Sequence, residues 1–155
     1  MREIIMKWNQ LGEMDCPVAR SLSILGDRWT LLIIRNALLN TKRFDDFHEQ
    51  LGMTRHLLAE RLNRLIEHGI MVKVPYQTTP KRYEYTLTEQ GKSLYPIILS
   101  LSEWGNQWLN PDQQYPQLHY LHKNCGQITR PSIRCSCCGE ILQATTIKPI
   151  LENTA

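Results

Sequence analysis

Several features typical of enzymes and membrane proteins are missing from this sequence of 155 residues. It has no apolar run approaching the roughly 20 residues of a transmembrane helix, so we expect no membrane span. Residues 1–7 lack the apolar stretch and cleavage site of a secretory signal, which favours the reducing cytoplasm. We find no nucleophile–base set, phosphate-binding glycine loop or paired acids, and therefore expect no enzymatic activity.

Cysteine is scarce before the last quarter of the chain. Cys16 stands alone there, and the other four of the five cysteines lie between residues 125 and 138. In a reducing compartment, such a cluster binds metal or does redox chemistry more often than it forms structural disulfides. Both alternatives are open at this point.

Four residues of the cluster have the spacing of metal ligands: His122, Cys125, Cys135 and Cys138. Each pair is separated by two residues and followed by a glycine, which permits a tight turn. One histidine and three cysteines would form a closed tetrahedral site for one structural zinc ion per chain. Cys137 is a substitute ligand and His119 a less well spaced one, and a metal-free hairpin is the alternative.

The first half of the chain shows the apolar periodicity of four helices. We expect them over residues 17–25, from a cap at Asp27 to Leu39, over 44–51, and over 55–68 after a cap at Thr54. Their order and the tight turn at Gly52 are typical of a helix-turn-helix. Two strands, 71–76 and 82–87, follow around a loop at 77–81 and predict a β wing.

A long amphipathic helix is expected from Thr88 to about Leu109. Pro96 predicts a kink, or a helix that is regular only beyond it. Its apolar stripe either covers the domain's own core or, as we favour, forms a dimer interface; the residues concerned are Leu94, Ile98, Leu101, Trp104 and Trp108. The sequence thus predicts a mainly α fold with a small antiparallel wing (α+β), divided into an arm (1–15), a winged domain (16–109) and a cysteine-rich, zinc-ribbon-like tail (110–155).

A series of motifs within residues 16–109 resembles the HxlR-type winged helix-turn-helix regulators of bacteria. The segments that carry the resemblance are Cys16–Val18, Leu25–Arg35, Arg43–Phe47, Leu58–Leu65 and Pro80–Thr88, followed by Gly91 and Trp104. The resemblance implies a cytoplasmic homodimer that binds a pseudo-palindromic operator in double-stranded DNA and represses or activates nearby genes. Some members of the family respond to oxidants or electrophiles through the cysteine that corresponds to Cys16.

The winged helix predicts which residues contact DNA. The first turns of the recognition helix read bases in the major groove, and the wing contacts phosphates or the minor groove. The candidates are Thr54, Arg55, His56, Ala59, Asn63, Arg64, Lys81, Arg82, Lys42 and Arg43. The net charge is only +3, but eight basic and five acidic residues lie between Lys42 and Arg82, so the excess is located there. For Arg61 we expect an ion pair with a neighbouring helix instead.

Cys16 is the candidate redox sensor. The positive end of the helix dipole favours a thiolate at a helix N-terminus, and a buried, inert cysteine is the alternative. Where the family has a two-cysteine switch between subunits, it uses a second sensing cysteine. No cysteine lies between Cys16 and Cys125, which argues against such a switch and leaves adduct formation or pairing with a tail cysteine open. Two other functions remain open: a winged-helix protein-interaction module with a zinc-stabilised tail, and a thiol-reactive redox protein.

Overall fold

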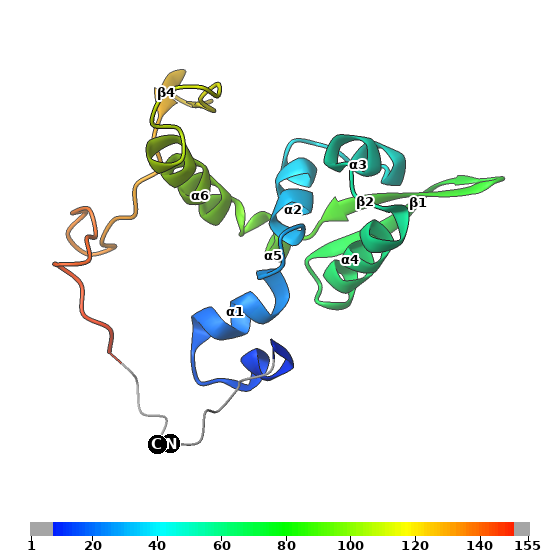
Figure 1. The fold of residues 1–155 in the computed structure, drawn as a ribbon, viewed down its shortest axis with the longest axis horizontal. Coiled ribbons are helices and arrows are strands. Elements are labelled where there is room, and N and C mark those ends of the chain that lie inside the picture. Colours follow the sequence, from blue (N-terminus) through cyan, green and yellow to red (C-terminus); the bar gives the residue numbers. More distant parts are fainter. Residues whose placement is uncertain (1–7, 151–155) are drawn as a thin grey trace. The chain divides into compact units, whose positions relative to one another are not determined.

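The computed structural model describes residues 8–150 as helices with two small antiparallel sheets (Figure 1). Residues 1–7 of the predicted arm and residues 151–155 of the predicted tail lie outside the described residues. The chain divides into two units, Met1–Ile98 and Leu99–Ala155. Among the described residues, every helix is too short or too polar to cross a bilayer.

The first unit begins with a 3-10 helix, η1 (Trp8–Glu13), followed by α1 (Pro17–Leu25) and α2 (Thr30–Leu38). Pro17 opens α1, where its missing N–H needs no partner. Asp27 caps the start of α2, because its Oδ1 accepts from the backbone N–H of Trp29 at 2.9 Å and of Thr30 at 3.1 Å. The predicted cap is confirmed.

The helix-turn-helix consists of α3 (Phe44–Leu51) and α4 (Arg55–Glu67). Gly52 ends α3 in the left-handed conformation, with φ of 64°, which glycine adopts without steric cost. Thr54 caps α4 by accepting from the N–H of Leu57 at 3.4 Å. Both helices agree with the predicted ranges to within one residue.

The wing is formed by β1 (Met71–Thr78) and β2 (Lys81–Leu87), which pair from Met71 opposite Leu87 to Thr78 opposite Lys81. Both strands are longer than predicted, because the polar residues 77, 78 and 81 continue the ladder. A hairpin that projects into solvent is held by backbone pairing and needs no apolar alternation at its tip. The predicted loop of five residues is therefore a turn at Thr79 and Pro80.

The core of the first unit lies among α2, α3, α4 and the base of the wing. Its largest fully buried side chains are apolar: Phe47, Ile33, Ile34, Leu58, Leu62, Leu65 and Met71. A buried polar contact joins α2 to α3, since Asn36 Nδ2 donates to Gln50 Oε1 at 2.9 Å. The recognition helix α4 is thus fixed by three leucines on one face, and its opposite face is exposed.

The predicted helix from Thr88 to Leu109 is two helices, α5 (Glu89–Lys92) and α6 (Tyr95–Trp108). Thr88 caps α5, as its Oγ1 accepts from Gly91 N–H at 3.1 Å. Pro96 lies in the first turn of α6 and has no N–H to continue the helix from α5. The prediction of one helix from Thr88 is wrong. The alternative of a helix that is regular only beyond Pro96 agrees with the structure except in its first turn, because α6 begins at Tyr95.

The second unit contains β3 (Tyr120–His122) and β4 (Gln127–Thr129), which form an antiparallel hairpin. A second turn follows, closed by the bridge between Arg134 and Ile141. From residue 99 to residue 150, the described part of this unit, no residue is buried. The tail, as far as residue 150, is therefore held by its turns and short strands, without an apolar core.

Candidate nucleic-acid interface

A cleft of about 380 Å³ lies where the first turns of α3 and α4 meet the wing. Its lining is charged and aromatic: Arg43, Phe44, Asp45, Asp46, Arg55, Tyr76, Lys81, Arg82, Tyr83 and Tyr85. We call it the interface cleft. Three parts of the chain that are distant in sequence supply its cations, namely the entry to α3, the start of α4 and the tip of the wing.

The interface cleft brings together four of the predicted DNA-contacting residues, Arg43, Arg55, Lys81 and Arg82, which are all exposed. Asp45 and Asp46 are its acidic residues, so the cleft carries an excess of positive charge. Such a surface suits the phosphates of a nucleic acid, and a guanidinium in its lining can also contact the edge of a guanine.

Arg55 is oriented by two contacts with α3. Its Nη1 lies 2.8 Å from Asp45 Oδ1, and its guanidinium lies 4.8 Å from the centre of the Phe44 ring. The side chains of Arg55 and Asp45 are 62% and 79% exposed, so their ion pair is weak and exchangeable in water. In the free protein, Arg55 is therefore held at the cleft by a partner that another acceptor can replace.

The tyrosines of the wing support the neighbouring cations. Lys73 Nζ lies 4.3 Å and Lys81 Nζ 5.5 Å from the centre of the Tyr83 ring, and Arg43 lies 5.1 Å from that of Tyr76. Rings at these distances attract cations electrostatically. Lys73 and the two tyrosines were not predicted as interface residues. The predicted strands did not indicate which cations would lie over their aromatic rings.

The remaining residues predicted on α4 have different surroundings. Thr54 is exposed and caps the helix, His56 and Asn63 are exposed, and Ala59 is half-buried. Arg64 is half-buried and donates from Nη2 to the backbone carbonyl of Ser23, so it joins α4 to α1. Within the free protein, this contact occupies the guanidinium that was predicted to contact phosphate.

Arg61 and Asp27 form the ion pair that the sequence led us to expect, with Arg61 Nε 3.2 Å from Asp27 Oδ1. Burial alone would raise the pKa of Asp27. The hydrogen bonds from the Thr30 hydroxyl and from the N–H groups of Trp29 and Thr30, together with the charge of Arg61, lower that pKa below its usual value. Asp27 thus connects the start of α2 with the inner side of the recognition helix.

The predicted metal ligands form two separate pairs. His122 Nδ1 lies 3.2 Å from Cys125 Sγ, and the glycines after each pair close matching turns, with Gly126 N–H donating to His122 O at 2.8 Å and Gly139 N–H to Cys135 O at 2.9 Å. Hydrogen bonds from the backbone N–H of Cys138 and then of Cys137 lower the pKa of the Cys135 thiol. Among the described residues, no three potential ligands lie together as a metal site.

The other predicted residues lie outside the interface cleft. Cys16 is the N-cap residue of α1, is half-buried, and has a free thiol. Lys42 lines a different cavity, on α2 and β2. Of the predicted dimer residues, Leu94 and Ile98 pack in the core, whereas Leu101, Trp104 and Trp108 are 50%, 52% and 62% exposed.

Comparison with known proteins agrees with the helix-turn-helix formed by α3 and α4. The family model of the HxlR-like helix-turn-helix matches residues 24–113. An uncharacterized HTH-type transcriptional regulator of Mycobacterium tuberculosis is 39% identical, over 85% of this chain and 83% of its own length.

Two solved structures are also similar. The crystal structure of PA1607, a proposed transcription factor, has a TM-score of 0.80 and 33% identity, over 91% of this chain and 98% of its own. The redox regulator HypR in its reduced form has a TM-score of 0.57 and 32% identity, over 64% of this chain and 100% of its own.

Proposed function

The chain belongs to the HxlR-like helix-turn-helix family of transcriptional regulators, and from this premise we propose that it binds operator DNA as a cytoplasmic homodimer. The proposal assigns it no enzymatic activity. The observation that carries it is the interface cleft, in which Arg55 of the recognition helix lies together with Lys81 and Arg82 of the wing. In this arrangement α4 enters the major groove, and the wing contacts the neighbouring backbone.

Arg55 and Lys81 have different tasks in this proposal. Arg55 reads a base in each half-site, so Arg55→Ala should weaken operator binding by about 1–3 kcal/mol per protomer and leave binding to unrelated duplexes nearly unchanged. Lys81 contacts phosphate, so Lys81→Ala should weaken binding to all duplexes alike and reduce the log–log salt slope by about 1 per protomer, which is about 2 for the dimer.

The test is a titration of the protein with a duplex from upstream of its own gene, over a range of salt concentrations. Lys148→Ala, an exposed change in the tail that also removes one positive charge, is the matched control and should leave the affinity unchanged. Affinity that is independent of salt and of both cleft variants would favour the alternative of a protein-interaction module.

We further propose that Cys16 makes DNA binding responsive to oxidants or electrophiles. Its position at the N-terminus of α1 supports this, and so does the similarity to HypR, which is described as a redox regulator. The deprotonated sulfur adds to an electrophile as a thioether, or attacks hydrogen peroxide, which breaks the O–O bond and gives a sulfenic acid and hydroxide.

Cys16→Ser should remove the effect of peroxide on operator affinity and preserve the affinity of the untreated protein. Cys137→Ser, which removes an exposed thiol of the tail, should preserve the response. An unchanged response in Cys16→Ser would exclude Cys16 as the sensor.

Zinc binding by the tail is a separate proposal. The matching turns and the 3.2 Å separation of His122 Nδ1 and Cys125 Sγ support it, because ligands of one tetrahedral zinc lie about 3.5 Å apart. From residue 99 to residue 150 this unit has no buried residue, so it also gains most from a metal that joins its two turns.

Metal analysis of the purified protein should give one zinc per chain, with a large loss in Cys125→Ser and none in Cys137→Ser. A ratio far below one in the unsubstituted protein would exclude zinc.

A further inference from the structure

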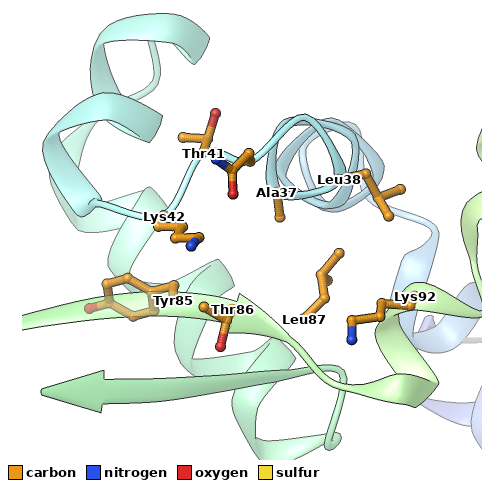
Figure 2. Close-up of a pocket in the computed structure, with 9 residues that line it drawn as sticks. Ala37, Leu38, Thr41, Lys42, Tyr85, Thr86, Leu87 and Lys92 are labelled. Atoms are coloured by element: carbon orange, nitrogen blue, oxygen red, sulfur yellow. The ribbon is translucent and has the colours of Figure 1, made fainter. Parts of the chain in front are cut away.

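A second cavity, of about 490 Å³, lies between α2, the end of β2 and α5 within the first unit. Nine residues line it (Figure 2): Ala37, Leu38, Asn40, Thr41, Lys42, Tyr85, Thr86, Leu87 and Lys92. We call it the α2–β2 cavity. Its volume lies within the range of about 300–1,000 Å³ that is typical of sites for small ligands.

The lining combines an apolar wall with positive charge. Ala37 and Leu38 reach toward the space from α2 and Leu87 from the end of β2, while the amines of Lys42 and Lys92 lie at its edges (Figure 2). None of the nine lining residues is acidic. A ligand that matches this lining has an apolar body and a negatively charged group.

The two lysines are available to such a ligand. Lys42 takes part in none of the ion pairs found in the described part of the chain. Lys92 Nζ lies 2.6 Å from Glu89 Oε1, but these side chains are 59% and 89% exposed, so the pair is weak in water. A carboxylate inside the cavity can therefore compete for both amines.

We propose that the α2–β2 cavity binds a small carboxylate with an apolar or aromatic body, and that the bound ligand weakens the affinity for DNA. The first half stands on the cavity alone, whereas the second half rests on the proposed function.

The cavity and the interface cleft are connected through two adjacent residues. Lys42 lines the cavity, and the next residue, Arg43, lines the cleft. Lys42 O accepts from Tyr85 N–H at 2.8 Å, Arg43 is bridged to Glu84, and Tyr85 lines both spaces. A carboxylate on Lys42 therefore neutralises a predicted phosphate contact and acts on the segment that positions Arg43.

Binding is tested without DNA by calorimetry and by ¹H–¹⁵N chemical shifts, with phenylacetate and its neutral amide, phenylacetamide, as probes. Phenylacetate should bind saturably, shift the amides of Leu38, Thr86 and Leu87, and bind about tenfold or more tightly than the amide. Equal affinity of acid and amide, shifts located elsewhere, or no saturable binding by either phenylacetate or hexanoate would overturn the site.

Two variants test the cavity by different means. Ala37→Leu fills it and should weaken phenylacetate binding about tenfold. Lys92→Gln removes one charge at its edge and should weaken binding several-fold, while Lys148→Gln in the tail should have no effect. If Ala37→Leu is poorly folded, Lys92→Gln alone tests the site. An affinity for phenylacetate that is unchanged in Lys92→Gln overturns the proposal that the ligand is a carboxylate.

The effect on DNA is measured separately, as operator affinity with and without phenylacetate. We expect several-fold weaker binding with phenylacetate and no change with the amide. Saturable cavity binding with unchanged operator affinity overturns the coupling only. Absence of DNA binding by the free protein overturns the proposed function and leaves the cavity result intact.

Discussion

At the scale of single residues, Asp27 has the most interactions of any carboxylate in the described chain. It accepts two backbone hydrogen bonds and one from a hydroxyl at the start of α2, and it pairs with Arg61 of α4. Its side chain is only 18% exposed, so little solvent competes for these contacts. Its charge is therefore important for the position of the recognition helix.

Asp27→Asn should lower the free energy of unfolding by about 1–2 kcal/mol near neutral pH. Because the pKa of Asp27 is lowered in the folded state, its stabilisation is complete above the unfolded value of about 3.9 and is lost as the pH falls through the lower folded value. Urea denaturation from about pH 6 to about pH 2.5 should therefore show the difference between the two proteins narrowing in acid.

The control is Asp15→Asn, since Asp15 is an exposed carboxylate before α1. It should change stability little at any pH. If the loss of unfolding free energy in Asp27→Asn were the same at acid pH as at neutral pH, the stabilising role of the Asp27 charge would be contradicted.

Local chemistry explains which single-residue predictions succeeded. The caps at Asp27 and Thr54 and the stop at Gly52 depend on neighbours within three or four residues, so the sequence is enough to predict them. The partners of Arg55 and Arg64 lie 10 and 41 residues away. Such partners depend on how the helices pack, and periodicity contains no information about that.

At the scale of elements, the break between α5 and α6 shows where a regular stripe misleads. The spacing of apolar residues continues through Leu94, but Pro96 has no N–H with which to continue the helix from α5. The backbone of α5 also packs tightly against the start of the wing. A Cβ on Gly91 would collide with the carbonyl oxygen of Ile70 and lie 2.9 Å from Leu87 Cδ2.

Gly91→Ala should therefore destabilise the protein by about 1–3 kcal/mol, as an overpacked site does. Gly105→Ala is the control, because a Cβ at Gly105 of α6 meets nothing within 4 Å in this chain. That change should be neutral or stabilise by up to about 1 kcal/mol, through helix propensity. Thermal unfolding measures the stability of both variants. If Gly91→Ala were as stable as Gly105→Ala, the close packing at Gly91 would be contradicted.

At the scale of the whole molecule, the apolar stripe from Leu94 to Trp108 divides into a buried part and an exposed part. Leu94 and Ile98 complete the core, which agrees with the alternative that we favoured less. Leu101, Trp104 and Trp108 are exposed and stay predicted dimer residues. The sequence does not distinguish the buried residues of the stripe from the exposed ones, because both follow the same helical spacing. The difference depends on which of them pack against the core of the first unit.

Trp104→Ser combined with Trp108→Ser should convert a dimer into a monomer and weaken operator binding by about 100-fold or more, because two linked half-sites become independent. Light scattering measures the mass and a DNA titration the affinity. The control is Leu39→Ser, because Leu39 is 66% exposed and lies at the end of α2, away from this stripe in the sequence. It should change neither the mass nor the affinity for DNA. A double variant that remains dimeric would place the interface on another surface.

In the proposed complex with DNA, the ion pair between Arg55 and Asp45 would affect how quickly DNA is searched. On a duplex without the correct base, Arg55 would keep its carboxylate, so the cleft would slide over the wrong sequence with one contact fewer to break at each step. At the operator, a guanine would exchange with the carboxylate, and the gain would be only the difference between the two acceptors. The pair would thus give up some affinity and shorten the time lost on wrong sites.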